Sequence, residues 1–338
     1  MYTIPFVDLR GYNLTYLMQE HADKAIAIIN ASREIFGLTS KFASYLVFPL
    51  GDVLSHHWLK KTNNPYLDEI EQFSKILAMK GVFALNLCYE WGCTSGAYRN
   101  NEAMILTRVL DWPFPKLGEN VVVTLQASEA GDFYNITWPG ISGVFNGMAQ
   151  GRFAAALNQA PMRRHKTGIA LDWIRNRMLV NSEYSLPPAH LLRKVFETAA
   201  NYEEAKILLS TTPISIPVIY ILTGINQTEG CVIERLENSY VIRELHNDKV
   251  CASNHFESNF NDVGYGWLPR EPNSKARLQS ACSLAAADID AGFNWCKAPI
   301  ANSLSRLALI ANAKDGTLSV MGTEGEKPVT YIFNKLVS

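Results

Sequence analysis

The sequence lacks the features that mark nucleic-acid-binding and membrane-spanning proteins. Its 31 Lys and Arg residues nearly balance 32 Asp and Glu residues, so the formal net charge is -1, and no basic stripe stands out. That balance gives no electrostatic reason to expect a nucleic acid or another strongly anionic partner. The longest apolar run, residues 214–222, contains Pro217 and is too short to cross a bilayer.

A signal peptide is also missing from the first ten residues, which have neither a charged start nor an uninterrupted apolar run. The six cysteines, at positions 88, 93, 231, 251, 282 and 296, form no Cys-x-x-Cys pair and are too sparse for a disulfide-stapled secreted domain. These absences predict a soluble chain in the cytoplasm, a reducing compartment. A secreted or lysosomal-like location stays open if a signal precedes this sequence.

Metal-binding patterns are missing as well. No pair of histidines has ligand spacing in a plausible setting, and the adjacent His56 and His57 point to different faces of the element that holds them. We therefore predict neither a metal nor any other cofactor.

The sequence does contain enough apolar material for a large core, since 48% of its 338 residues are hydrophobic. Segments with helical or strand-like patterns alternate along the chain: helical at 14–36, 63–77, 168–179, 188–200, from 201, 274–287 and 302–311, and strand-like at 121–125, 133–138, 153–157, 214–223, 231–235, 240–245, 250–253, 317–321 and 329–333, with a turn at Asn146-Gly147. This order predicts an α+β fold in which two antiparallel sheets stack between helical layers, a four-layer αββα sandwich with a mainly helical N-terminal segment.

Residues suited to nucleophilic chemistry gather in one short stretch. Cys93 is followed by Thr94 and Ser95, and Arg108 and Asp111 come fifteen and eighteen positions later. The intervening residues, with a polar centre at 98–102, predict two strands joined by a hairpin turn. In such a hairpin Arg108 and Asp111 return to the start of the first strand, beside Cys93.

The order Tyr89-Glu90, Cys93-Thr94-Ser95 and Arg108-x-x-Asp111 resembles the family that includes acid ceramidase and N-acylethanolamine-hydrolysing acid amidase. Choloylglycine hydrolases and penicillin V acylases are more distant relatives. Members of the family are N-terminal-nucleophile hydrolases with the αββα fold, whose precursor cuts itself before a cysteine. The similarity to acid ceramidase continues through residues 201–209, 219–224 and 229–234.

The resemblance implies a division of this chain at the Gly92–Cys93 bond. Residues 1–92 would form a small, mainly helical chain and residues 93–338 the catalytic one, which together would make an α/β heterodimer. By the same resemblance, Cys93 is the nucleophile and its freed α-amino group is the base, because an α-amino group with a pKa near 8 is partly neutral around pH 7.

The other implied site residues stand at places that match the family pattern. Arg108 would favour the thiolate, Asp111 would hold the α-amino group, and Asn158 and Asn254 would form the oxyanion hole. Arg277 matches the second active-site arginine, with Arg270 as a competing choice. Glu90 would assist the self-cleavage.

Simpler interpretations of the same residues stay open. Arg108 and Asp111 could form a surface ion pair, the two asparagines could end strands as turn residues, and Arg277 could be a solvated arginine at a helix start. The remaining five cysteines, like the aromatic residues of 42–58, are taken as core residues, although the latter would also suit an acyl-chain cleft.

The resulting functional prediction is a cysteine amidohydrolase that acts on a linear N-acyl amide, either a ceramide or an N-acylethanolamine, at a membrane or micelle surface. Bile-salt or penicillin-type hydrolysis, N-acyl transfer and a non-cleaving binding protein are the alternatives. A papain-like pair of Cys93 and His255 is a further one. Val109-Leu110 and His255-Phe256 depart from the family pattern and bear most on the choice of substrate.

Overall fold

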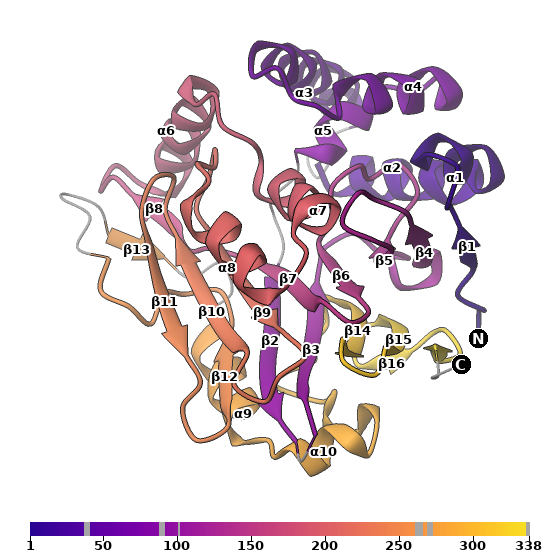
Figure 1. The fold of residues 1–338 in the computed structure, drawn as a ribbon. Coiled ribbons are helices and arrows are strands. Elements are labelled where there is room, and N and C mark those ends of the chain that lie inside the picture. The colour runs from indigo at the N-terminus through magenta and orange to yellow at the C-terminus, as the bar shows by residue number, and fades with distance from the viewer. Residues whose placement is uncertain (37–40, 88–91, 101, 261–265, 269–272, 336–338) are drawn as a thin grey trace.

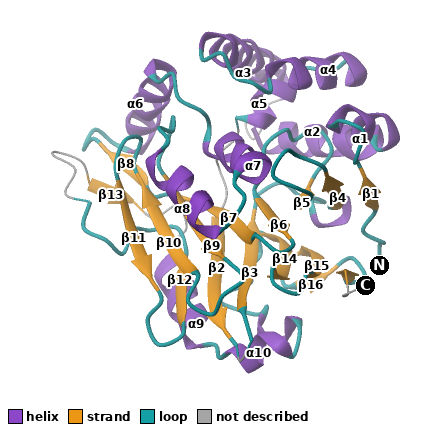
Figure 2. Ribbon diagram, in the orientation of Figure 1, coloured by secondary structure: helices purple, strands orange, loops and turns teal. Residues whose placement is uncertain are grey.

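Two sheets packed face to face form the centre of the computed structural model, which describes residues 1–36, 41–87, 92–100, 102–260, 266–268 and 273–335 (Figure 1, Figure 2). The 8-stranded sheet has the order β1 (Phe6–Asp8), β4 (Val122–Gln126), β5 (Phe133–Thr137), β6 (Asn146–Ala149), β7 (Phe153–Gln159), β9 (Val218–Thr223), β10 (Gly230–Arg235) and β11 (Tyr240–Glu244). The 7-stranded sheet has the order β12 (Lys249–Ala252), β2 (Gly92–Arg99), β3 (Met104–Asp111), β14 (Ser305–Asn312), β15 (Thr317–Glu324) and β16 (Lys327–Pro328), with β17 (Phe333–Lys335) also on β15.

Pairing within both sheets is antiparallel except between β1 and β4. A small separate sheet pairs β8 (Met162–Arg164) with β13 (Gly266–Leu268). The space between the two large sheets is filled mainly by aliphatic side chains of β4, β7, β9, β10 and β14, most of them fully buried.

Helices cover the outer face of each large sheet. Helices α7 (Pro188–Thr198) and α8 (Tyr202–Thr211) pack on the 8-stranded sheet, over β7, β9 and β10. Helix α9 (Ser274–Ser283) packs on β2 and β12 of the other sheet, and α10 (Ala286–Asp290) follows it. The layers therefore run helix, sheet, sheet, helix, and the predicted αββα sandwich is confirmed.

The N-terminal segment is mainly helical, as predicted, and lies at one end of the sandwich (Figure 1). It contains α1 (Leu14–Glu20), α2 (Ala22–Phe36), α3 (Lys41–Lys61), α4 (Leu67–Leu77) and α5 (Val82–Asn86). The single helix predicted over 14–36 is two helices, because His21 leaves helical geometry with φ -133° and ψ 38°. Helix α3 was not predicted, and α6 (Ile169–Ser182) faces it across a cavity described below.

An ionic cluster ties α4 to the sandwich. Arg193 of α7 donates to Glu69 at 2.6 Å, to Glu197 at 2.8 Å and to the Ser142 carbonyl at 2.9 Å. The guanidinium also lies 4.2 Å from the centre of the Tyr66 ring. The side chain of Arg193 is only 11% exposed, so its charge depends on these partners rather than on water.

Two sequence predictions about local structure were wrong. Asn146-Gly147 lies inside strand β6 rather than in a turn: Asn146 is buried and donates to the Ile136 carbonyl at 2.6 Å, and a Cβ on Gly147 would come within 3.0 Å of the Phe196 ring. The segment predicted as a helix at 302–311 contains β14, which lies between β3 and β15. Burial on both faces outweighs the helix propensity of its Leu and Ala residues.

Replacement of Arg193 by Met should lower the free energy of unfolding by about 3 kcal/mol, because Glu69 and Glu197 would lose a shared, nearly buried cation. Urea denaturation measures the loss. Arg10→Met is the matched control, since the ion pair of Arg10 with Asp8 is exposed and its removal should leave the urea midpoint in place. Equal midpoints for wild type and Arg193→Met would contradict this account of the cluster.

Candidate active site

The hairpin β2–β3 sets the positions of the predicted site residues. In its antiparallel register Gly92 lies opposite Asp111, Cys93 opposite Leu110, and Ser95 opposite Arg108. Side chains of directly opposed residues point to the same face, and successive residues alternate. Cys93 and Arg108 therefore face the 8-stranded sheet, whereas Asp111 faces α9. The predicted hairpin, with its return of Arg108 and Asp111 beside Cys93, is confirmed.

The Cys93 thiol lies in a buried polar pocket between the sheets. Arg108 donates an Nη2 hydrogen bond to Cys93 Sγ at 2.9 Å, and the Leu157 carbonyl lies 3.9 Å from the same sulfur. The other terminal nitrogen of Arg108 donates to the Leu157 carbonyl and, at 3.2 Å, to Asn158 Oδ1. The guanidinium thus joins the thiol of β2 to the end of β7.

Burial decides the protonation state of this thiol in the uncut chain. Desolvation raises the pKa of Cys93 to about 11, although the charges of Arg108 and Arg277 act to lower it. The expectation that Arg108 favours the thiolate is correct for the arginine alone, but complete burial is the larger effect. Cys93 is therefore a protonated thiol at neutral pH before any cleavage.

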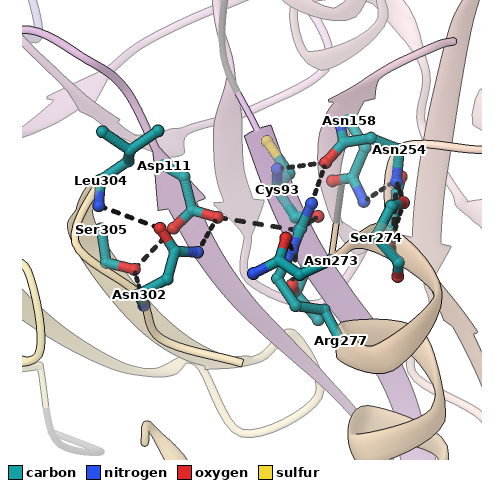
Figure 3. Close-up of polar contacts among 12 residues, drawn as sticks. Cys93, Asp111, Asn158, Asn254, Asn273, Ser274, Arg277, Asn302, Leu304 and Ser305 are labelled. Carbon is teal, nitrogen blue, oxygen red and sulfur yellow. Dashed lines mark hydrogen bonds and ion pairs between the residues drawn. The ribbon is translucent and has the colours of Figure 1, made fainter. Parts of the chain in front are cut away.

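Asn254 holds the backbone of Cys93. Its Oδ1 accepts from the Cys93 N–H at 2.7 Å and from Arg277 Nη2 at 2.9 Å, and its Nδ2 donates to the Gln159 carbonyl at 2.8 Å (Figure 3). A backbone N–H and a guanidinium can only donate, so they fix which side of the amide carries the oxygen. Among the described residues Asn254 Nδ2 donates this one bond, so its second hydrogen can serve another acceptor.

Asn158 is oriented in the same way. Its Oδ1 accepts from Arg108 and, at 2.7 Å, from the Ser95 hydroxyl, while its Nδ2 donates to the Ser253 carbonyl at 3.3 Å. Both asparagines are fully buried. Asn158 lies within β7, whereas Asn254 lies in the bend that follows β12, so the alternative of a turn residue at a strand end still fits Asn254.

Arg277 approaches from α9, on the other face of β2. It donates to the Cys93 carbonyl, to Thr94 Oγ1 at 2.9 Å and to Asn273 Oδ1 at 2.9 Å, and it lies 3.7 Å from Asp111 (Figure 3). The side chain is fully buried, so it is not a solvated arginine at a helix start. The competing Arg270, like Glu90, lies outside the described residues.

Asp111 is held by residues that the sequence had not indicated. Ser305 donates to its Oδ1 at 2.6 Å and Asn302 to its Oδ2 at 2.8 Å (Figure 3). Burial raises the pKa of Asp111, while Arg277 and these two hydrogen bonds lower it. Because Asp111 is buried, the alternative of a surface ion pair does not hold.

His255 is directed away from the thiol. Its Nδ1 bonds to Ser274 Oγ at 2.8 Å and its Nε2 to Glu257 at 2.9 Å. The described bonds of Cys93 go instead to Arg108, Asn254, Leu157, Gln159 and Arg277. The structure therefore does not form the papain-like pair of Cys93 and His255.

A cavity of about 590 Å³ opens next to the site, between α3, α6 and the end of β7. It includes Gln159, whose backbone N–H bonds to the Cys93 thiol. Much of its lining is apolar, including Leu54, Trp58, Leu85, Met162, Ile174 and Ile216. Trp58 also donates to the Val180 carbonyl at 2.9 Å, so it serves both packing and the cavity wall.

Within the ranges that the structure describes, no cluster of His, Cys, Asp and Glu could hold a metal ion. A search of the described helices also finds none with the length and apolar character needed to cross a membrane.

Replacement of Arg277 by Met should cost about 3 kcal/mol of stability at pH 7, because Asp111 would be left as an uncompensated buried carboxylate. The pKa of Asp111 would then rise further, and the loss should shrink as the pH falls and the carboxyl takes up a proton. Urea denaturation at pH 7 and pH 5 measures both effects.

Arg235→Met is the matched control, since Arg235 is buried but donates to the backbone carbonyls of Leu209 and Thr212. Its loss of stability should not shrink at the lower pH. The double variant Arg277→Met/Asp111→Asn should recover part of the stability; a double variant no more stable than Arg277→Met would contradict the assigned pairing.

No family model matches the chain, but its sequence is similar to those of known enzymes. The N-acylethanolamine-hydrolyzing acid amidase of Mus musculus is 29% identical over 178 residues, which is 51% of this chain and 47% of the relative. The acid ceramidase of Homo sapiens is 29% identical over 190 residues, which is 55% of this chain and 43% of the relative. The chain thus spans just under half the length of these curated relatives.

Among solved structures, the Caenorhabditis elegans ortholog of N-acylethanolamine-hydrolyzing acid amidase superposes with a TM-score of 0.51 and 21% sequence identity. The match covers 65% of this chain and 92% of the ortholog, so the fold is shared. The chain is thus similar in sequence, over about half of its length, to acid ceramidase and N-acylethanolamine-hydrolyzing acid amidase, and it shares the fold of the Caenorhabditis elegans ortholog of the latter.

Proposed function

We propose that the chain is a cysteine N-terminal-nucleophile amidohydrolase that activates itself by cleavage between Gly92 and Cys93. The proposed substrate is a linear N-acyl amide, either a ceramide or an N-acylethanolamine. The observation that carries the proposal is the setting of Cys93, whose thiol lies 2.9 Å from Arg108 and whose N–H lies 2.7 Å from Asn254 Oδ1. The choice of an amide substrate rests on the similar proteins, which are an acid amidase and an acid ceramidase.

Self-cleavage would use the thiol that later performs catalysis. Cys93 Sγ attacks the Gly92 carbonyl carbon, an S–C bond forms, the C–N bond breaks, and the Cys93 nitrogen takes the thiol proton. Water then hydrolyses the thioester, which leaves a carboxylate on Gly92 and a free thiol and α-amino group on Cys93. A pKa of about 11 makes the thiol a slow nucleophile in the uncut chain, but this step occurs only once per molecule.

After cleavage, Cys93 would supply both nucleophile and base. The α-amino group, with an ordinary pKa near 8, accepts the thiol proton as sulfur attacks the substrate carbonyl and returns it to the leaving amine. Asp111, opposite Gly92 in the hairpin, is the nearby carboxylate proposed to hold the charged amino group. In the uncut chain the Cys93 N–H binds Asn254 instead, so this contact would form only after the cut.

The two asparagines are the proposed donors to the tetrahedral oxyanion. Each Oδ1 is occupied by groups that donate, and among the described residues each Nδ2 donates one hydrogen bond, which leaves its second hydrogen for a substrate oxygen. Donors that are fixed before the reaction stabilise developing negative charge without reorganisation.

The apolar cavity suits the acyl chain of the substrate. It begins at Gln159, one residue after Asn158, and is lined by apolar side chains of α3, α5 and α6. Three charged residues line its wall: Arg163 and Glu237 pair with one another through bonds of 2.6 and 2.5 Å, and Arg177 is the third. Because most of the lining is apolar, a hydrocarbon chain suits this cavity better than the charged end of a conjugated bile salt.

Exposed apolar residues near this cavity are the proposed contact with a membrane or micelle. They lie on α3 and α6, two helices that contribute residues to the lining of the cavity. Their exposed fractions run from 48% to 68%, in Leu50, Val53, Leu54, Leu171, Ile174 and Met178. An apolar surface beside the mouth of a lipid site would take substrate from a bilayer without passing it through water.

The two fragments would stay together after the cut as an α/β heterodimer. Bonds that cross the proposed boundary include Glu69 to Arg193 at 2.6 Å and Trp58 to the Val180 carbonyl at 2.9 Å. Strand β1 also pairs with β4 of the larger fragment. These non-covalent contacts would hold the two fragments together without a covalent link between them.

Incubation of the full chain under acidic, reducing and detergent conditions should yield a fragment whose first residue on N-terminal sequencing is Cys93. Cys93→Ala should stay at 37.7 kDa and lack amidase activity, because it has no thiol to attack the Gly92 carbonyl. Cys231→Ala, which changes another fully buried cysteine, is the matched control and should cleave normally. A wild-type chain that stays intact and inactive in every condition would contradict the proposal and favour a binding protein.

A panel of ceramide, an N-acylethanolamine, a conjugated bile salt and penicillin V should show hydrolysis of the first two only, as measured by amine release. Leu50→Glu should slow hydrolysis of substrate embedded in vesicles about tenfold, through lost apolar contact, and spare a soluble short-chain amide. Ile207→Glu, which alters an exposed residue of α8, is the control. Preferred hydrolysis of the bile salt or penicillin V would overturn the substrate assignment while leaving the nucleophile in place.

A further inference from the structure

Two cysteines outside the candidate active site lie against each other where β12 meets α9. Cys251 of β12 is buried and Cys282, near the end of α9, is exposed. Each thiol affects the pKa of the other, which places the two side chains close together. Both are free cysteines, and neither has a part in the proposed reaction.

Tyr98 fixes the geometry around this pair. Its hydroxyl accepts from the Cys251 thiol at 3.6 Å and donates to the carbonyl of Ala281, the neighbour of Cys282, at 2.9 Å. The Tyr98 ring occupies the space that a Cβ on Gly96 would fill, so the glycine opposite Cys251 allows this arrangement. Tyr98 thus joins Cys251 to the residue that precedes Cys282.

Cationic groups surround the pair. Lys249 donates to the Leu284 carbonyl at 2.6 Å, and Arg243 donates to the Cys251 carbonyl at 2.9 Å. The neighbouring Cys251 thiol and these two charges lower the pKa of Cys282 to about 7, against the opposing effects of burial and of Glu257. A lowered pKa favours the thiolate, which is the reactive form, at the exposed Cys282.

We propose that Cys251 and Cys282 are a reversible disulfide site that responds to peroxides. The exposed Cys282 thiolate attacks one oxygen of hydrogen peroxide, the O–O bond breaks, and a sulfenic acid forms with release of hydroxide, which takes a proton to become water. The Cys251 thiol then attacks the sulfenic sulfur, the S–O bond breaks, and the second oxygen leaves as water with the proton of Cys251. Two thiols are oxidised and one peroxide is reduced to two waters.

The cross-link would fasten two elements that carry proposed site residues. Asn254 follows Cys251 by three positions, and Arg277 precedes Cys282 by five. The bond between Asn254 and Arg277 belongs to the same contact between β12 and α9. Because Tyr98 already joins Cys251 of β12 to the residue before Cys282 on α9, closure requires little movement of either element. The disulfide should therefore stabilise the chain by restricting the unfolded state rather than by changing the folded one.

The test is a count of free thiols before and after treatment of the full chain with one equivalent of hydrogen peroxide. The chain is then denatured, alkylated and weighed, and its tryptic peptides are mapped. The oxidised chain should carry two fewer alkyl groups, with the peptides of Cys251 and Cys282 joined until a reductant is added. Its thermal unfolding midpoint should rise by several degrees and return after reduction. The count does not depend on amidase activity, so its failure and failure of the proposed function are separate results.

Cys282→Ser should keep its remaining thiols after the same treatment, and Cys296→Ser, the matched control at a half-buried cysteine, should still lose two. An unchanged thiol count in the wild type would overturn the proposal. So would a sulfinic acid on Cys282 with Cys251 still alkylated, or a disulfide that joins Cys282 to a second chain.

Discussion

The contact of Asn254 with both Cys93 and Arg277 is the constraint on which the site depends. One amide oxygen accepts from the backbone of β2 and from a guanidinium of α9, while its nitrogen reaches the end of β7. Three elements that are far apart in the sequence are therefore held to one another at Cys93, the second residue of β2. Loss of any of these bonds would leave a buried donor or charge unsatisfied, which makes the arrangement rigid.

Two buried arginines on opposite faces of β2 extend the same constraint. Arg108 lies between the sheets beside the thiol. Arg277 extends from α9 toward the other face of β2, where it lies beside Asp111. A buried guanidinium is tolerated only where carbonyls, amides or carboxylates meet its N–H groups. The surrounding backbone must therefore hold its acceptors in place, and a hairpin paired on both edges, by β12 and β14, is well suited to that task.

The same burial explains why the uncut chain would be a poor enzyme for an external substrate. Cys93 is shielded from solvent and its thiol carries a raised pKa, so neither access nor protonation favours attack on another molecule. Conversion of the Cys93 amide to an α-amino group would add a base beside the sulfur and a positive charge for Asp111. In this account a single covalent change at Gly92–Cys93 creates both functional groups.

Much of the site could be predicted because it depends on local patterns. The hairpin follows from strand-like residues around a polar turn, and the family motif supplied roles for Cys93, Arg108, Asp111 and the asparagines. The support of Asp111 by Asn302 and Ser305 was missed, because their segment has the composition of a helix and becomes a strand only between two partners. The raised pKa of Cys93 could not be predicted from the sequence either, because the segments that shield the thiol from water are distant from it in the sequence.

The most direct test of the central claim is to trap the acyl-enzyme. The active protein is mixed with an N-acyl amide substrate, quenched in acid within one turnover and mapped by mass spectrometry. The account predicts an acyl group on the peptide that begins at Cys93, removable by hydroxylamine as expected of a thioester, with none on the uncut chain. An acyl group on a different residue, or on a Cys93 still joined to Gly92, would contradict it.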